Sequence, residues 1–220
     1  MPPKVVTKTG AAAAKPAAKS KYTLTYFNIR ARGELCRLLF AQAGIEYKDV
    51  RIEQADWPKF KKETPNGTLP FLDVEGKQIG QSMAIARYLA SEFGLNGKNK
   101  LESCMIDEYL CNIVDFMTKI FAPVFEKDEA KKAELTKEFA GEILPKFLKM
   151  TETKIGKSGW IIGEKISVAD IALYDVLFGI SQTEGDKFMA LAPKVKANYE
   201  KVQSQPKIKA WLAKRPVTAM

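Results

Sequence analysis

The period of the apolar side chains changes along this chain: strand-like and helical segments alternate in its first half, and only helical spacing follows. Residues 22–26 alternate in polarity and favour a strand, and the leucines of residues 35–39 recur at helical spacing before Gly44. Residues 47–52 again favour a strand. Because a strand, a helix and a strand joined by short links form a right-handed βαβ unit, this segment predicts a parallel pair of strands.

The next segment predicts a hairpin followed by a helix. Residues 71–74 and 77–79 flank a Glu-Gly turn, and Ser82 precedes a run of apolar residues at helical spacing. Residues 94–100, rich in Gly and Asn, are typical of a connector to a second module. In that module helices are predicted at about residues 101–121, 129–153, 167–180, 194–204 and 206–214.

These patterns predict an α/β module at residues 21–97 and an all-α module at residues 98–220. Ser167, followed three residues later by Asp170, is typical of a structural capping box at a helix start. Residues 1–20 consist mainly of Ala, Lys, Pro and Thr, so they cannot bury enough apolar surface to offset the entropy of ordering. We therefore expect residues 1–20 to form a disordered basic tail.

The chain contains no histidine, which excludes several kinds of catalytic site. Ser-His-Asp and Cys-His nucleophile pairs, HExxH metalloprotease sites and histidine-containing zinc sites all need this residue. Cys36, Cys104 and Cys111 form no CxxC pair and are odd in number, so neither a disulfide framework nor a four-cysteine zinc site is predicted. This cysteine usage favours a reducing compartment.

Hydropathy and charge favour a cytoplasmic protein without membrane attachment. No apolar stretch approaches the roughly 18–20 residues of a membrane span, and the first residues contain no apolar signal-peptide core. Of the net charge of +9, the four lysines in residues 1–20 contribute a part that no acid offsets there. Such a tail is either a solvated arm or a loose contact for phosphates, and nucleic-acid binding is not expected.

Four ordered segments identify a family. They are KYTLTYFNIRARGE at residues 21–34, RIEQADWP at 51–58, NGTLPFL at 66–72 and QSMAIARYL at 81–89. In these segments the chain closely resembles cytosolic glutathione transferases of the sigma class, and the resemblance extends to the terminal KRPV. It implies a thioredoxin-like N-terminal domain, an all-helical C-terminal domain, a homodimer, and glutathione as co-substrate with no further cofactor.

The resemblance assigns the catalytic role to Tyr26, near the end of the first predicted strand. A thiol with a pKa of about 8.5 is mostly protonated at neutral pH, so thiolate chemistry needs a group that stabilises the anion. A phenol that donates a hydrogen bond to sulfur does so, and Arg32 adds positive potential. Taken alone, Tyr26 would be interpreted as a core aromatic and Arg32 as a surface charge; the surrounding motif favours catalysis.

The resemblance also implies which residues bind the tripeptide. Trp57 and Lys61 contact its glycyl carboxylate, and Gln81 and Ser82 bind the γ-glutamyl carboxylate at a helix start, where backbone N–H groups are free. Asp115 reaches the γ-glutamyl ammonium across the dimer. The alternative interpretations are packing for Trp57, simple helix capping for Ser82, and a satisfied or solvated helix acid for Asp115. The loop that faces the cysteinyl part contains Gly67, Thr68 and Leu69, followed by a proline expected in the cis form.

Ile29, Ala31 and Met117 are candidates for an apolar pocket that takes the second substrate, with core packing as the alternative.

Two departures from the sigma pattern argue against prostaglandin isomerisation and against a metal site. The class includes a glutathione-dependent prostaglandin isomerase with a tryptophan shortly after its Asp-Phe-Met segment, whereas residues 118–123 contain none. The acids that bind a divalent ion at that enzyme's dimer interface are also depleted, so no metal site is predicted.

We therefore expect an enzyme of detoxification that conjugates glutathione to hydrophobic electrophiles. One alternative is a structural lens protein of the S-crystallin type with weak activity, although the insertion typical of those proteins is absent from the sequence. Others are a glutathione-dependent prostaglandin isomerase and a noncatalytic module like the transferase-like domain of elongation factor 1 gamma. The set Tyr26, Lys61, Gln81 and Ser82 favours the enzyme over a scaffold, which has no need of it.

Overall fold

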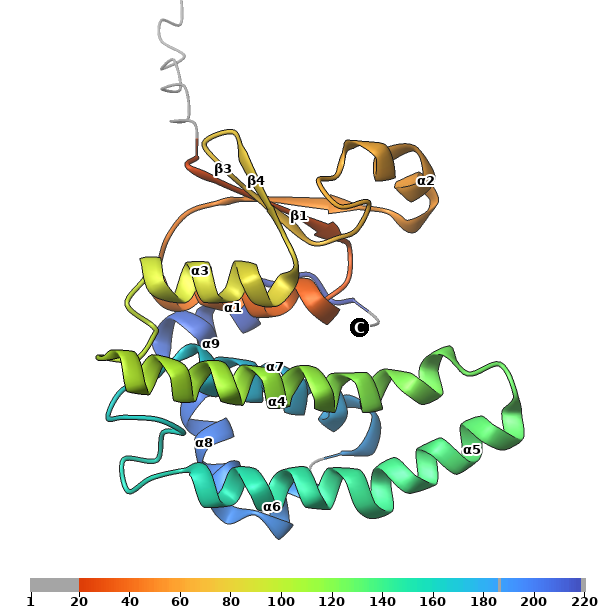
Figure 1. Ribbon diagram of the computed structural model, residues 1–220, viewed down its shortest axis with the longest axis vertical. Helices are drawn as coiled ribbons and strands as arrows, with labels where there is room; N and C mark the ends of the chain where they lie inside the picture. The colour runs from red at the N-terminus through yellow and green to blue at the C-terminus, as the bar shows by residue number, and fades with distance from the viewer. Residues whose placement is uncertain (1–19, 186, 219–220) are drawn as a thin grey trace, which may run out of the picture.

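The computed structural model describes residues 20–185 and 187–218, so only Ser20 of the predicted tail is described. A sheet region packs on a larger helical region (Figure 1). The sheet region contains β1 (Tyr22–Phe27), α1 (Ala31–Ala43), β2 (Lys48–Ile52), α2 (Trp57–Phe60) between two 3-10 turns (Gln54–Asp56 and Lys61–Glu63), β3 (Phe71–Val74), β4 (Lys77–Gly80) and α3 (Ser82–Glu92). The helical region contains α4 (Lys100–Phe125), α5 (Glu129–Glu138), α6 (Leu144–Lys154), α7 (Val168–Glu184), a 3-10 segment (Lys187–Leu191), α8 (Pro193–Gln203) and α9 (Pro206–Lys214).

The four strands form one mixed sheet in the order β2-β1-β3-β4. Strand β1 runs parallel to β2, and β3 runs antiparallel to both β1 and β4. The predicted parallel pair and the predicted hairpin are therefore confirmed. Tyr26 pairs with Arg51 and Phe27 with Ile52, so the carboxyl ends of β1 and β2 meet at one edge. Helices α1 and α3 pack together between this sheet and the helical region (Figure 1).

Helix α7 forms the centre of the helical region. Its residues Ala169, Ile171, Leu173, Tyr174 and Leu177 are fully buried, which is expected where a helix is apolar around its whole circumference. It packs against α1 of the sheet region and against α4 and α8. The central helix thus joins the sheet region to the rest of the molecule.

The predicted capping box fixes the start of α7. The Asp170 carboxylate accepts hydrogen bonds from the backbone nitrogen and from Oγ of Ser167, both at 2.9 Å. It also accepts from the backbone nitrogen of Ile161 at 2.9 Å and from Nδ2 of Asn198 at 2.8 Å. One buried carboxylate therefore holds together the helix start, the preceding loop and α8.

The helix predicted at residues 129–153 is interrupted in the structure. A π-helical turn, Phe139–Ile143, separates α5 from α6. Pro145 has no N–H to donate to the carbonyl four residues back, and Gly141 has a low helix propensity, so regular hydrogen bonding fails there. Helix α4 differs as well, because it continues about one turn beyond its predicted end, through Pro123.

The last helix returns to the sheet region and packs on α1. Lys207 Nζ donates a hydrogen bond to the carbonyl of Ala43 at 2.9 Å. Trp211 Nε1 and Arg215 Nη1 donate to Oε1 of Glu34 on α1 at 2.9 and 2.8 Å. These contacts attach the end of the chain to the helix that follows β1.

Candidate active site

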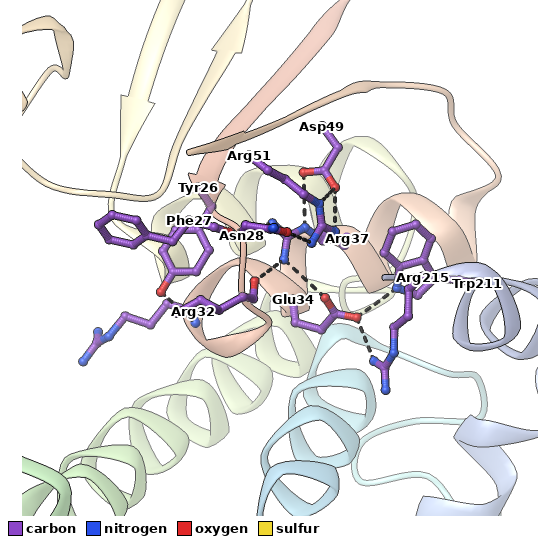
Figure 2. A network of polar contacts seen from close by, with 11 residues as sticks. Tyr26, Phe27, Asn28, Arg32, Glu34, Arg37, Asp49, Arg51, Trp211 and Arg215 are labelled. Carbon is purple, nitrogen blue, oxygen red and sulfur yellow. Dashed lines mark hydrogen bonds and ion pairs between the residues drawn. The ribbon is translucent and has the colours of Figure 1, made fainter. Parts of the chain in front are cut away.

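Tyr26 lies near the carboxyl end of β1, with its ring buried and its hydroxyl group directed at the start of α1 (Figure 2). Its Oη accepts a hydrogen bond from the backbone nitrogen of Arg32 at 3.3 Å. The fit depends on Gly33, where an added Cβ would stand 2.5 Å from Cδ1 of the Tyr26 ring. Helix α1 can begin this close to the ring because residue 33 has no side chain.

The surroundings of Tyr26 keep its hydroxyl group protonated. Burial raises the pKa of Tyr26 above its ordinary value of 10.0, while the hydrogen bond from the Arg32 backbone opposes the rise. Because that N–H occupies an acceptor site on the oxygen, the phenolic proton remains available to another partner. Tyr26 can therefore donate a hydrogen bond to an anion within reach of its oxygen, such as a thiolate.

The Arg32 side chain is exposed and extends away from the polar contacts of Glu34 and Arg37 (Figure 2). Its guanidinium lies 5.9 Å from the centroid of the Phe121 ring on α4. Within the described part of the chain it forms no ion pair. Its positive charge is therefore available to a ligand near Tyr26.

Arg37, on α1, binds backbone carbonyl groups of the segment between β1 and α1 (Figure 2). Its Nη1 donates to the carbonyl of Ile29 at 2.7 Å, and its Nη2 donates to the carbonyl of Phe27 at 3.4 Å. It also pairs with Asp49 at 3.2 Å and with the buried Glu34 at 3.4 Å. This charged network fixes the backbone that presents Tyr26 and Arg32.

The loop between β2 and β3 brings other predicted residues toward the same edge of the sheet. Trp57 begins α2, and its ring meets the ring of Phe27 edge-on at 5.5 Å between centroids. Lys61 follows one turn later. The loop also carries Gly67, Thr68 and Leu69, and the bond from Leu69 to Pro70 is cis, as expected.

Gln81, directly before α3, has a backbone conformation that side chains rarely adopt. Its φ is 69° and its ψ is 110°, a strained combination of the kind found at binding sites. Helix α3 begins at Ser82, and no side chain of the described residues caps its first N–H groups. These free N–H groups and the helix dipole favour an anion there. Gln81 and Ser82 thus adjoin a place suited to a carboxylate.

A cavity of about 270 Å³ opens between the start of α1, helix α4 and helix α7. Its walls are mostly apolar and include Phe121 and Val124 of α4 and Val176 and Ile180 of α7. A smaller cavity of about 10 Å³, which reaches Arg32 and Ser82, shares four of its lining residues with the larger one. The shared residues are Ala31, Met117, Asp175 and Val176.

Of the three residues predicted to line an apolar pocket, Ala31 and Met117 line both cavities. Ile29 lines neither of them, and its carbonyl group is instead bound to Arg37. Asp115 is exposed on α4 and also lines neither cavity. The contact of Asp115 with glutathione across a dimer therefore stays a prediction.

Comparison with known proteins places these features in one family. Family models for the glutathione S-transferase N-terminal domain and C-terminal domain match residues 22–91 and 114–215. The hematopoietic prostaglandin D synthase of Gallus gallus is 41% identical over 203 residues, which cover 90% of this chain and 98% of that protein. The chain belongs to the glutathione S-transferase family.

Other relatives show how varied the glutathione S-transferase family is. S-crystallin SL11 of Nototodarus sloanii is 41% identical over 202 residues, covering 90% of this chain and 98% of that protein. A monomeric glutathione S-transferase of the hookworm Necator americanus has a crystal structure with a TM-score of 0.81 and 34% identity, covering 90% of this chain and 99% of that one. The predicted fold, the transferase family and its co-substrate glutathione are thereby confirmed.

Several residues that line the larger cavity of this glutathione S-transferase are not predicted from its sequence. Arg30, Phe121, Phe139 and Asp175 all line it, although they come from four separate segments. Phe121 and Phe139 give no distinguishing signal, because both fit ordinary apolar stripes. Asp175 does give one: it is a single acid within the otherwise apolar and uncharged stretch 171–180.

No cysteine of the described residues lines either cavity. Cys36 is fully buried on the apolar face of α1, and burial raises the pKa of its thiol to about 12. Cys104 and Cys111 are exposed. Among residues 20–185 and 187–218, no group of three His, Cys, Asp or Glu side chains is placed to hold a metal ion. Nor does any helix in these ranges have the length and apolarity to cross a membrane.

Proposed function

We propose that this glutathione S-transferase conjugates the thiolate of glutathione to hydrophobic electrophiles and so serves in detoxification. The observation that supports this most directly is the hydroxyl group of Tyr26, which accepts a hydrogen bond from the Arg32 backbone while burial of the residue raises its pKa. A cavity with mostly apolar walls lies next to the segment that starts at Ala31. The thiolate of glutathione and an apolar electrophile can thus meet beside Tyr26.

In this mechanism Tyr26 donates its hydrogen bond to the sulfur of glutathione, and the thiol proton passes to solvent. The exposed guanidinium of Arg32 lowers the energy of the thiolate further. The sulfur electron pair then forms a bond to the electrophilic carbon, and a leaving group departs with its bonding pair. Holding both reactants in one site removes much of the entropic barrier.

The remaining predicted residues bind the tripeptide in this proposal. The uncapped start of α3 receives the γ-glutamyl carboxylate, supported by the strained backbone of Gln81 and the free N–H groups at Ser82. The loop after β2 receives the rest of glutathione, and its contributing residues are Trp57, Lys61, Gly67, Thr68 and Leu69.

We further propose that the chain is a cytoplasmic sigma-class enzyme and a homodimer in which Asp115 of one protomer reaches the glutathione of its partner. Leu101, Met105 and Val114 expose large apolar side chains on α4, and Asp115 directly follows Val114. Equilibrium sedimentation of the full chain tests the proposed dimer, because a monomer at micromolar concentration contradicts it.

Turnover of 1-chloro-2,4-dinitrobenzene by the wild type and Tyr26→Phe, together with retention on immobilised glutathione, tests the proposed activity. The phenylalanine keeps the ring packing and removes the hydrogen bond to sulfur. We expect both proteins to be retained and the variant to lose about 10²-fold in kcat. Retention of the wild type without turnover would instead support an S-crystallin-like role, and equal rates in both proteins would remove Tyr26 from the mechanism.

A second candidate activity is glutathione-dependent isomerisation of a prostaglandin endoperoxide, which the prostaglandin D synthase relative favours. In this chain residues 118–123 contain no tryptophan, and Phe121 lines the cavity there. Incubation with prostaglandin H2 and glutathione, followed by product analysis, separates this activity from conjugation.

A further inference from the structure

Helix α7 brings one acidic side chain to the wall of the cavity. Among the described residues that line the two cavities, Asp175 is the only acid, and it lines both of them. The smaller cavity reaches Arg32 and Ser82, where glutathione is expected, and the larger one is mostly apolar. Asp175 therefore lies, with Ala31, Met117 and Val176, where the linings of the two cavities overlap.

Asp175 has no committed partner among the side chains of the described ranges, where it takes part in no hydrogen bond or ion pair. The nearby cations have other contacts: Arg215 pairs with Glu34 at 2.8 Å, Arg37 pairs with Glu34 and Asp49, and Arg30 lies 4.8 Å from the centroid of the Phe178 ring. Asp175 thus has its polar atoms free for a molecule in the cavity.

The surroundings favour the protonated form of this carboxyl group. Burial raises the pKa of Asp175 to about 8, and the charge of Glu34 acts in the same direction, whereas Arg215, Arg30 and Arg37 act against it. A carboxylic acid that keeps its proton at neutral pH can donate it. The charged and titratable groups that face Asp175 are Tyr26, Arg30, Glu34, Cys36, Arg37, Tyr174 and Arg215.

We propose that Asp175 donates a proton to the oxygen of carbonyl electrophiles bound in the cavity, which makes it a further catalytic residue. The inference rests on the proposed conjugation reaction, because it concerns the second substrate of that reaction. It assigns a chemical role to a half-buried acid that has no structural partner in the described ranges and lies on a helix whose buried residues are almost all apolar.

With an α,β-unsaturated aldehyde, the reaction is an addition of the glutathione thiolate in which every proton and electron pair is accounted for. The sulfur electron pair forms the C–S bond at the β carbon, and the π electrons of the C=C bond shift so that negative charge develops on the carbonyl oxygen. The proton of the Asp175 carboxyl group passes to that oxygen and gives an enol, which becomes the aldehyde product by tautomerisation. The resulting carboxylate regains its proton from water, and the thiol proton of glutathione was released to water earlier.

The test compares two electrophiles in the full-length protein. trans-2-Nonenal needs a proton on oxygen, whereas 1-chloro-2,4-dinitrobenzene releases chloride and needs none. We expect Asp175→Asn and Asp175→Val to lower kcat/KM for nonenal by about tenfold or more. In the same variants kcat/KM for 1-chloro-2,4-dinitrobenzene should change by about twofold or less. Glu200→Gln, which removes an exposed carboxylate on α8, is the matched control.

The pH profile of the wild type gives a second measurement that needs no variant. Relative to turnover of 1-chloro-2,4-dinitrobenzene, turnover of nonenal should fall above a pH of about 8, because Asp175 loses its proton there. A constant ratio of the two activities across this range, or an equal loss of both in Asp175→Asn, overturns the inference and leaves conjugation intact. Absence of turnover with 1-chloro-2,4-dinitrobenzene in the wild type overturns the proposed function and the inference together.

Discussion

Gly33 controls the position of Tyr26 although it has no side chain of its own. It lies directly after Arg32, whose backbone nitrogen contacts Tyr26 Oη, and it faces the Tyr26 ring. A Cβ atom at this position would stand 2.5 Å from Cδ1 and 2.8 Å from Cγ of that ring. Because the ring is buried, any substitution must displace either the ring or the first turn of α1.

We therefore predict that Gly33→Ala lowers kcat for 1-chloro-2,4-dinitrobenzene by about 10²-fold, because small displacements of a catalytic group cost this much. The measurement is steady-state turnover at saturating glutathione. Gly156→Ala is the control, since its added Cβ would stand no closer than 3.9 Å to Trp160 and Ser158, and Gly156 lines neither cavity. Equal kcat in both variants would show that the ring tolerates the shift.

Single residues also show how far the sequence predicts the site. The motifs around Tyr26, Trp57 and Gln81 predicted residues that the fold brings to one edge of the sheet or to the adjoining helix start. Asp175 was not predicted, because it lines the cavity only as a result of α7 packing beside α1 and α4. Local spacing does not encode which distant elements a side chain will face.

At the scale of elements, α7 depends on the four hydrogen bonds that Asp170 accepts. Asp170→Ala leaves these buried donors without their acceptor, and each unsatisfied group costs about 1–3 kcal/mol. We predict that the free energy of unfolding falls by about 3 kcal/mol or more. Chemical denaturation followed by circular dichroism measures the change.

Asp107→Ala is the matched control for Asp170→Ala. Asp107 is a half-exposed aspartate whose ion pair with Arg87 is 2.8 Å long, and such surface pairs contribute about 1 kcal/mol or less. Similar losses in the two variants would contradict the assignment of stability to the capping box.

The periodicity of apolar residues predicted the type and order of almost every element, because each long helix has one buried face. It failed at the π-helical turn Phe139–Ile143, which depends on Gly141 and Pro145 rather than on polarity. It also ended α4 too early, since Pro123 argues against a helix that packing nonetheless continues. Both errors fall beside the cavity, which Phe139 and Pro123 line.

For the whole molecule, Glu34 links the sheet region to the last helix. Its carboxylate is 1% exposed and binds Arg37, Trp211 and Arg215. Removing one partner of a buried ion pair leaves charges uncompensated. We predict that Glu34→Gln lowers the free energy of unfolding by about 3–5 kcal/mol, measured by urea denaturation.

Glu92→Gln serves as the control for Glu34→Gln. Its carboxylate is exposed and lies 3.6 Å from Lys21, so its removal should shift the urea midpoint far less. If the two variants unfold at the same urea concentration, the link through Glu34 does not stabilise the molecule.

The position of Glu34 also limits how genes of this family can recombine. An exchange between relatives that joins the sheet region of one to the helical region of another must keep both the acid on α1 and its donors at positions 211 and 215. If only one side is inherited, the chimera contains either a buried Glu34 that keeps Arg37 alone as its partner, or Trp211 and Arg215 without their acceptor. We therefore expect viable hybrids to inherit these positions as a set, even where their crossover lies far from them in the sequence.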